Sequence, residues 1–456
     1  MNLETDNKIQ KKGITLVIPN PCGNIKETKM KNSGVEWIGE IPEDWEVKKV
    51  KHSFVRKNEK AMQENPIVLS LARSGVRERD ISNNEGQLAE SYYNYNPVDV
   101  DDLLINPMDL YSGANCSISK VKGVISPAYI NLRAKKNVSP VFYDYYFKVQ
   151  YWMMAFFAHG NGVSFENRWT LNNETLQNYP IVAPSFETQQ RIATYLDKKC
   201  SKIEETIQNQ QQVIEKLKAY KQSLITEAVT GKVKIENGKI CGEYESYKES
   251  GVEWIGKIPS EWTKQKLKFA SQIMRGLFSH RPRNDPDYYD GVHPFIQTGE
   301  VARAVKYITT YSQTLNELGF SVSREFPAGT VLLTIAANVG DVAILDFNAC
   351  FPDSVIGFYP KDNVSKVFLY YLLKSMKEQF MKNAIISTQM NLNINIVKEE
   401  VIPLPSLKEQ EEIVCFLENK SDIIDTAIEQ KQNLIEKLTE YKKSLIYEYV
   451  TGKKEI

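Results

Sequence analysis

The chain has 456 residues, 42% of them hydrophobic, so it is long enough for two to four domains and apolar enough to bury sizeable cores. Its 57 lysines and arginines are balanced by 57 aspartates and glutamates, which gives a formal net charge of zero. This composition excludes a disordered chain and a uniformly basic one, so any nucleic-acid surface has to be local.

The first 32 residues lie outside the repeat described below, and we interpret them as an N-terminal extension. Residues 1–12 are polar and charged, which predicts no signal peptide. The most apolar stretch, residues 145–158, is far shorter than a bilayer span and contains Lys148 and Gln150, which favours a core helix. We therefore expect a soluble, cytoplasmic protein that does not enter a membrane. The cysteines form no CxxC pair and show no metal-ligand spacing, so reduced thiols are expected at Cys22, Cys116, Cys200, Cys241, Cys350 and Cys415.

One opening block occurs twice. The heptapeptide Ser-Gly-Val-Glu-Trp-Ile-Gly stands at residues 33–39 and again at residues 250–256, and an Ile-Pro pair and a tryptophan follow each copy. The stretches that come next, roughly residues 47–183 and 263–404, barely resemble each other. Two copies of a shared block, each followed by an unlike stretch of sequence, predict two modules that have the same geometry and bind different targets.

The tryptophans of the repeated block invite two interpretations. Aromatic rings can serve as stacking platforms for unpaired bases. We favour a place in the protein core, because these residues recur in the shared frame whereas specificity should lie in what differs between the copies. The residues concerned are Trp37, Trp45, Trp254 and Trp262.

Each variable stretch begins with a basic run. The first run lies between Glu46 and Glu59 and the second ends before Asp285, with no acidic residue inside either. Such a run is usually a solvated face. Its recurrence at the same place in both modules weakens that interpretation and favours contacts to DNA phosphates from the lysine runs at 48–57 and 264–268, which set position and salt sensitivity rather than sequence. The runs contain Lys48, Lys49, Lys51, Arg56 and Lys57, and then Lys264, Lys266, Lys268, Arg275, Arg281 and Arg283.

Candidate base-reading residues lie on predicted loops of the variable stretches. Arginine and lysine recognise guanine edges in the major groove, and asparagine and glutamine recognise adenine. An apolar run at residues 67–71 predicts a strand, and Gly75 behind it predicts a turn that presents arginines. Each candidate taken alone is as readily an ordinary exposed loop residue. The first stretch offers Arg73, Ser74, Arg77, Arg79, Asn161 and Arg168, and the second offers Arg275, Ser279, Arg281, Arg283, Gln297, Thr298, Gln389 and Asn391.

The closing segment of each module predicts a long helix. Positions spaced by seven from Leu196 and from Cys200 form a mostly apolar a/d seam over about four to five heptads, which is typical of a coiled coil. The second copy repeats this seam at an offset of 221 (417 minus 196). A proline before each segment and a glycine after it are start and stop signals. The apolar seam residues are Leu196, Ile203, Ile207, Ile214, Leu217 and Leu224, and then Leu417, Ile424, Ile428, Ile435, Leu438 and Leu445.

Polar residues interrupt both seams at the same two places, Gln210 and Lys221 in the first copy and Lys431 and Lys442 in the second. This coincidence favours two helices that pack on each other, with the interruptions fixing the register at some cost in stability. The alternative is that each helix packs separately on its own domain. At 1.5 Å per residue, about forty residues make a rod of about 60 Å, which we interpret as a spacer.

The repeated blocks carry a resemblance to a known family. The opening block, the segments at residues 184–190 and 405–410, and the Leu-Ile-x-Glu-x-Val-Thr-Gly endings resemble the specificity (S) subunits of type I restriction-modification enzymes. The resemblance covers nearly the whole chain beyond about residue 30. One departure is that Glu187-Thr188-Gln189 stands where the family usually has the Glu-Gln pair that the second copy keeps at residues 409–410.

The resemblance implies an α+β fold, with two mixed α/β target recognition domains joined by two long antiparallel coiled-coil helices and an internal pseudo-twofold repeat. It also implies a non-catalytic subunit that binds double-stranded DNA, two methylation subunits and, through them, restriction subunits. S-adenosylmethionine, ATP and Mg²⁺ are then expected on the partners, and no cofactor on this chain. The implied segments are recognition domains at 33–183 and 250–404, spacer helices at 184–232 and 405–456, and a linker at 233–249.

Residue patterns agree with a reader that lacks its own catalysis. Two half-sites held on a rod predict a bipartite target with a fixed gap, and unlike inserts predict unlike half-sites. We find no methyltransferase cofactor loop with its Asn-Pro-Pro-aromatic element, no P-loop and no histidine ligand set. Pro352-Asp353 lacks the following carboxylate and lysine of a Mg²⁺ nuclease. Two other classes stay open, namely a fused enzyme that reads and modifies DNA, and a coiled-coil adaptor with two protein-binding domains.

Overall fold

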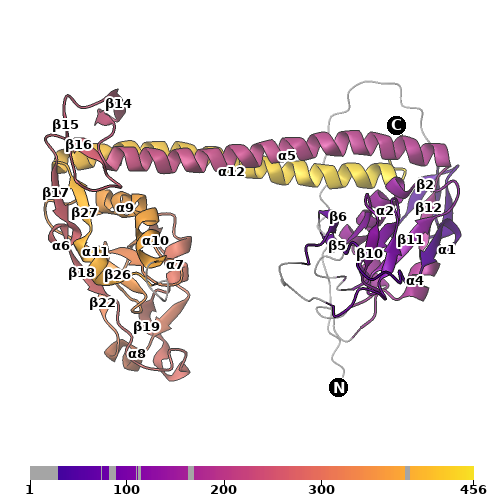
Figure 1. Cartoon of the computed structure of the whole chain (residues 1–456), viewed down its shortest axis with the longest axis horizontal. Coiled ribbons are helices and arrows are strands. Elements are labelled where there is room, and N and C mark those ends of the chain that lie inside the picture. The colour runs from indigo at the N-terminus through magenta and orange to yellow at the C-terminus, as the bar shows by residue number, and fades with distance from the viewer. Residues whose placement is uncertain are drawn as a thin grey trace, which may run out of the picture. The chain divides into compact units, whose positions relative to one another are not determined.

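The computed structural model describes residues 29–72, 74–81, 89–108, 110, 115–162, 169–385 and 391–456. It consists of two compact units (Figure 1), unit 1 with Met1–Glu205 and Lys437–Ile456, and unit 2 with Thr206–Glu436. The predicted closing helices are present as α5 (Phe186–Val229) and α12 (Leu407–Val450), each 44 residues long. Both helices contribute a part to each unit, so the units divide within the helices rather than at their ends.

The repeated opening block forms the same frame in both units. In unit 1, β1 (Met30–Asn32) pairs with β2 (Glu40–Pro42), and β3 (Glu46–Lys49) pairs with β12 (Pro180–Ala183), just before α5. In unit 2, the corresponding pairs are β15 (Tyr247–Glu249) with β16 (Lys257–Pro259) and β17 (Thr263–Lys266) with β27 (Val401–Leu404), just before α12. Trp45 and Trp262 are 4% and 1% exposed, so the core interpretation of these two tryptophans is confirmed.

The variable domain of unit 1 is built on the antiparallel sheet β4-β11-β8-β9. Helix α2 covers it with the buried rings of Phe142, Tyr143 and Phe147, and Phe54 of β4 packs edge-on against Tyr143. In chain order, the elements of this domain are α1 (Val50–Ser53), β4 (Phe54–Lys57), β5 (Leu69–Ala72), β6 (Gly75–Glu78), β7 (Asn96–Val98), β8 (Leu103–Ile105), β9 (Cys116–Ile118), β10 (Gly123–Ile125), β11 (Ile130–Ala134), α2 (Pro140–Trp152), α3 (Ala155–Ala158) and α4 (Asn173–Asn178).

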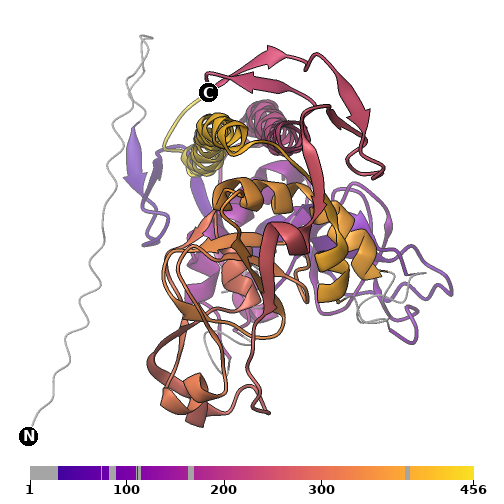
Figure 2. The same cartoon turned by 90° about the vertical axis from the view of Figure 1, so that its left-hand side faces the viewer.

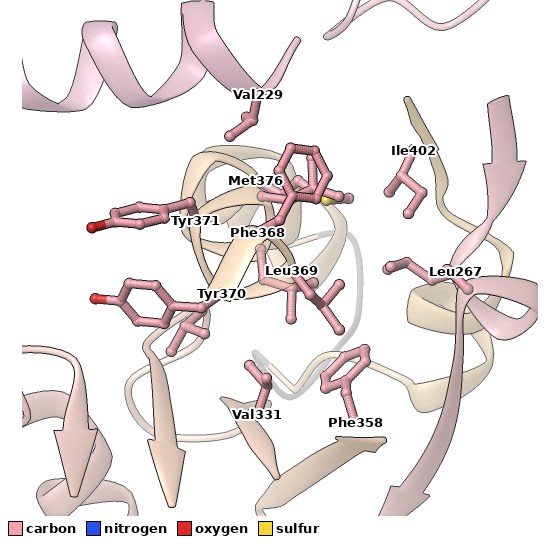
Figure 3. Close-up of a cluster of buried hydrophobic side chains, with 14 of the residues drawn as sticks. Val229, Leu267, Val331, Phe358, Phe368, Leu369, Tyr370, Tyr371, Met376 and Ile402 are labelled. Atoms are coloured by element: carbon pink, nitrogen blue, oxygen red, sulfur yellow. The ribbon is translucent and has the colours of Figure 1, made fainter. Parts of the chain in front are cut away.

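The variable domain of unit 2 contains two sheets, with strand orders β18-β26-β23-β24-β20 and β21-β19-β25-β22. Figure 3 shows how Phe368 and Leu369 of α9 fill the space between the first sheet and Val229 of α5, and all three residues are buried. The elements are α6 (Leu267–Ala270), β18 (Ser271–Arg275), η1 (Pro286–Tyr288), β19 (Tyr289–Phe295), α7 (Thr298–Arg303), β20 (Tyr307–Ile308), β21 (Gln313–Leu315), α8 (Glu317–Ser321), β22 (Glu325–Phe326), β23 (Val331–Thr334), β24 (Val342–Leu345), β25 (Ala349–Cys350), β26 (Val355–Pro360), α9 (Lys366–Ser375), α10 (Lys377–Ile385) and α11 (Ile394–Glu399).

Two predicted helices are interrupted in the structure. The sequence pattern of residues 141–158 predicts one helix, but the helix ends at Trp152 and resumes at Ala155, because Met154 adopts the left-handed conformation with φ +58°. The sequence pattern of residues 367–381 also predicts one helix, but the structure breaks it at Met376, between α9 and α10. The apolar runs at residues 331–335 and 342–345 predict strands, and these are confirmed as β23 and β24.

Within each unit, the parts of α5 and α12 that belong to it pack antiparallel, which confirms that the helices contact each other. The predicted polar interruptions make the contacts. Lys221 Nζ binds Asp425 Oδ2 at 2.6 Å in unit 2, and Lys442 binds Glu204 in unit 1. These two ion pairs are equivalent in the repeat, since both partners differ by 221 (442 minus 221, and 425 minus 204). Lys431 Nζ also donates to Gln210 Oε1 at 3.1 Å in unit 2. The twelve apolar seam residues are all buried or half-buried.

Each frame is closed by the end of one long helix. An added Cβ at Gly452 would lie 2.3 Å from Pro42 Cδ, and one at Gly231 would lie 2.4 Å from Pro259 Cδ. Both glycines also have positive φ, +72° and +73°. Only glycine fits such a close, left-handed approach, so the repeated Thr-Gly ending is explained by packing. Among the described residues, we find no helix with the length and apolarity that a membrane span requires.

The second sheet of unit 2 and α8 lie at the end of that unit farthest from its parts of α5 and α12 (Figures 1 and 2). A linker hairpin, β13 (Lys234–Glu236) with β14 (Lys239–Gly242), follows α5.

Candidate nucleic-acid interface

The first two lysines of the first basic run lie on the shared frame. Lys48 and Lys49 are exposed on β3, where Lys48 pairs with Ile181 and Lys49 with Pro180 of β12. Lys48 Nζ also lies 2.8 Å from Glu46 Oε2, an exposed pair that contributes little to stability. These positions leave both amines accessible to a phosphate backbone, and their assignment to phosphate contacts stays a prediction.

The end of the first basic run is anchored by two aspartates of the loop before β8. Lys57 Nζ contacts Asp99 Oδ2 at 3.0 Å and the buried Asp102 Oδ2 at 3.1 Å. Arg133 of β11 donates to both carboxylates, with its Nε 2.9 Å from Asp102 Oδ1. Hydrogen bonds from Arg133, and then from Lys57, lower the pKa of Asp99 to about 2. This network fixes β4, β11 and the loop to one another, so Lys57 acts within the fold.

The predicted arginine turn of unit 1 is a hairpin of β5 and β6. Ala72 pairs with Gly75 and Ser70 with Arg77, and Gly75 has φ +114°, which confirms the turn. Ser74 and Arg77 are exposed, and Arg79 is half-buried with its backbone N–H bonded to Val68 O at 2.8 Å. Arg73 lies outside the described residues.

The second candidate loop of unit 1 is closed at its base. Asn161 and Thr170 exchange two backbone hydrogen bonds of 2.9 Å, and Trp169 Nε1 donates to Phe157 O at 2.8 Å. Asn161 itself is exposed. Arg168 falls outside the described residues.

The second basic run is also partly neutralised within the fold. Lys264 donates to Ser250 O of the repeated block. Lys266 and Lys268 each lie 2.6 Å from an oxygen of Glu399, and these contacts lower the pKa of Glu399 to about 2. Since contacts within the fold hold these lysines, the recurrence that favoured phosphate binding has a structural explanation as well.

Three arginines predicted to read DNA come together in unit 2. Arg275 Nε donates to Asp353 O at 2.5 Å, Arg281 Nη2 lies 3.4 Å from Asp353 Oδ2, and Arg283 binds Asp353 Oδ1. All three arginines are exposed. Ser279, also exposed, extends the same loop and donates through N and Oγ to Val322 O.

The amide candidates of unit 2 lie on other elements. Gln297 caps α7, where its N–H donates to Glu300 Oε2 at 2.9 Å and its side chain donates to Gln313 Oε1 at 2.9 Å. Thr298 is the first residue of α7 and is half-buried. Asn391 is exposed, and Gln389 falls outside the described residues.

Sequence reasoning missed four residues of these clusters. Asp353 was considered only as part of a nuclease motif, Arg324 was not considered, and neither were Asp99 and Arg133. Arg324 Nη1 donates to Arg275 O at 3.0 Å. The spacing of Asp99 and Asp102 around an Asp-rich turn was the available signal, whereas residues 275, 324 and 353 meet only through sheet pairing.

Comparisons with known proteins agree with this architecture. Residues 259–437 match the family model described as the type I restriction modification DNA specificity domain. The type I restriction enzyme MjaIX specificity subunit of Methanocaldococcus jannaschii is 32% identical over 176 residues, which are 38% of this chain and 40% of that protein. The EcoBI specificity subunit of Escherichia coli is 25% identical over 345 residues, or 72% of this chain and 68% of that protein.

One solved structure shows the same fold over most of the chain. It comes from work on "complex assembly and conformational transition of the type I R-M system" and superposes with a TM-score of 0.67 at 14% identity, covering 90% of this chain and 98% of the other. The chain is therefore similar to type I restriction-modification specificity subunits in the matched domain, in its relatives and in its fold.

Proposed function

We propose that this chain reads an asymmetric, bipartite DNA target, with one half-site contacted by the variable domain of unit 1 and the other by that of unit 2. The observation that carries this proposal is the use of one frame for two unlike domains. The frame strands and closing glycines recur, while the domain on one frame is built on a four-stranded sheet and the other on a five-stranded and a four-stranded sheet. Sequence differences between half-sites require such differences between readers.

We further propose that α5 and α12 dock two methylation subunits, through which restriction subunits join, and that the chain itself performs no catalysis. Tyr220 and Tyr441 support two equivalent docking surfaces. They are 55% and 50% exposed and differ by 221 positions (441 minus 220). Large exposed aromatic residues are enriched where proteins bind each other. In this proposal S-adenosylmethionine, ATP and Mg²⁺ are bound by the partner subunits.

Methylation mapping tests the proposal. A host that expresses the chain with its methylation subunit is sequenced by long-read methylation calling, and the expected pattern is two short words separated by a fixed gap. A modification pattern that forms one uninterrupted word contradicts it.

Single substitutions can distinguish residues that recognise bases from residues that contact phosphates. Replacing Arg77 by alanine is expected to change one half-site only, whereas replacing Lys264 is expected to weaken binding to all DNA alike. Gel-shift titrations with the mapped target and with a scrambled duplex measure both effects. A change at both half-sites in the Arg77 variant contradicts the assignment of that residue.

A further inference from the structure

Four arginines gather where β18 ends, in the second variable domain. Arg275, Arg281 and Arg283 contact Asp353, and Arg324 donates to the backbone oxygen of Arg275. The guanidinium groups come from two segments, namely the end of β18 with its following loop and the turn before β22, and Asp353 comes from a third, the loop between β25 and β26. This convergence puts several positive charges around one carboxylate.

The backbone beneath the cluster is tightly packed. Gly276 N donates to Val355 O at 2.9 Å, and a Cβ on Gly276 would lie 2.3 Å from Pro352 O. Phe278 also forms an isolated bridge with Ser323. The loop that carries the arginines is therefore held against the Asp353 loop by main-chain contacts that do not depend on the Asp353 side chain.

The Asp353 carboxylate uses a different oxygen for each of two arginines. Oδ1 accepts from Arg283 and Oδ2 from Arg281, while Arg281 Nη1 also donates to Phe278 O at 2.6 Å and His280 O at 2.7 Å. The side chains of Arg281 and Arg283 are still 51% and 46% exposed, and that of Asp353 is 32% exposed. Each guanidinium has five N–H donors, so these contacts leave donors that face solvent.

We propose that Asp353 is a positioning residue that orders Arg281 and Arg283 for recognition of base edges in one half-site, and that Arg324 belongs to the same DNA-contacting surface. The inference rests on the proposed DNA-reading function. A long arginine side chain loses rotamer freedom when it binds, and a carboxylate that orders it beforehand removes part of that cost. Bidentate contacts from arginine to guanine require such an orientation.

Positioning and simple charge neutralisation predict opposite effects. If Asp353 only offsets positive charge, its removal strengthens binding to every DNA, because phosphate contacts dominate affinity. If it orders the arginines, its removal weakens binding to the target while binding to unrelated DNA is unchanged or stronger. The difference between specific and non-specific affinity therefore separates the two roles.

The test uses the full-length chain assembled with its methylation subunit, and the Asp353→Asn variant. The probes are a duplex with the target mapped for the unaltered protein, two duplexes in which one half-site at a time is scrambled, and a fourth in which both half-sites are scrambled. We expect the variant to bind the target about 10-fold to 100-fold more weakly, to lose discrimination at one half-site only, and to bind the doubly scrambled duplex at least as tightly. Asp353→Glu keeps the charge and is expected to keep most of the discrimination.

Asp362→Asn is the matched control, since Asp362 is an exposed aspartate of the same unit and its change adds the same charge. It is expected to leave discrimination unaltered. The inference is overturned if Asp353→Asn binds all four duplexes more tightly with discrimination intact. If Asp353→Asn does not fold, Arg283→Lys is tested in its place, because lysine keeps the charge but lacks the bidentate guanidinium. Intact discrimination in the Arg283→Lys variant overturns the inference. An unaltered protein that fails to discriminate its mapped target contradicts the proposed function instead.

Discussion

The two copies of the repeat carry different residues at one position near the start of the long helices, and this difference suggests a substitution experiment. In unit 2, Glu409 Oε1 accepts a hydrogen bond of 3.1 Å from Nε1 of the buried Trp262, and Glu409 Oε2 accepts from Ser406 N and Oγ at 3.2 and 2.9 Å. In unit 1, Thr188 stands at the equivalent position (409 minus 221) and contacts Ser185 Oγ at 2.9 Å. The substitution Glu409→Thr therefore converts the second junction into the first.

We expect Glu409→Thr to destabilise unit 2 by about 2–3 kcal/mol. A buried indole N–H that loses its acceptor costs about 1–3 kcal/mol, and the loss of the reciprocal helix cap adds about 0.5–1 kcal/mol. With a denaturant slope of about 2 kcal/mol per molar urea, the unfolding midpoint moves by about 1 M. Urea titration with hydrogen exchange of residues 254–262 measures the change in unit 2 directly.

Glu411→Thr is the matched control. Glu411 is exposed two residues further along α12, so its substitution changes charge and helix propensity in the same way. We expect an effect below about 1 kcal/mol, from the interaction with the helix N-terminus alone. Equal midpoints for the two variants would refute the argument that the Glu409 contacts stabilise the junction. The converse change, Thr188→Glu, is expected to stabilise unit 1 by about 1 kcal/mol.

Three further predictions concern packing, pH and the proposed gap. Gly231→Ala should destabilise unit 2 by about 2–4 kcal/mol in thermal melts, because it combines a positive φ with a clash against Pro259. The control is Gly238→Ala, which has φ +70° and open space around it and should destabilise the unit by only about 1 kcal/mol. Equal losses of stability in the two variants would contradict the clash. Because Arg133 and Lys57 hold the pKa of Asp99 at about 2, below its ordinary 3.8, its contribution to stability is complete above about pH 4 and is lost as the pH falls through about 2. Acid titration of Asp99→Asn should therefore show a flatter loss of stability in that window, and an unchanged slope would exclude the role of the network. Adding one helical turn within either spacer helix should change the gap between half-sites and leave both half-site sequences unchanged, and methylation mapping that shows altered half-sites would refute this.

The helices and frames were predictable because their signals are local or repeated. The heptad positions of Leu196 and Leu417 placed the two long helices to within a few residues of α5 and α12, and the shared interruptions at Gln210 and Lys431 predicted a contact that the structure contains. The repeat was informative there because each heptad position and each polar interruption occurs in both copies of the sequence.

The variable domains were less predictable because short strands pair over long distances. Strands of three to five residues, such as β8 and β11, carry little periodicity and reveal their order only in three dimensions. The arginine cluster has the same origin, since Asp353 lies 72 residues from Arg281 (353 minus 281). Residue type marked Arg281 as a candidate, but its carboxylate partner could not be inferred from spacing.

The closing glycines bear on the order in which the chain folds during synthesis. Gly231 and Pro259 are separated by 28 residues (259 minus 231), whereas Pro42 and Gly452 are separated by 410 (452 minus 42). Contacts between distant residues form late because a long loop has to close first. The contact between Gly231 and Pro259 can therefore form on the ribosome soon after residue 262 emerges, and the pairing of β17 with β27 follows once residue 404 is made. The contact between Pro42 and Gly452 waits for the residues that follow α12.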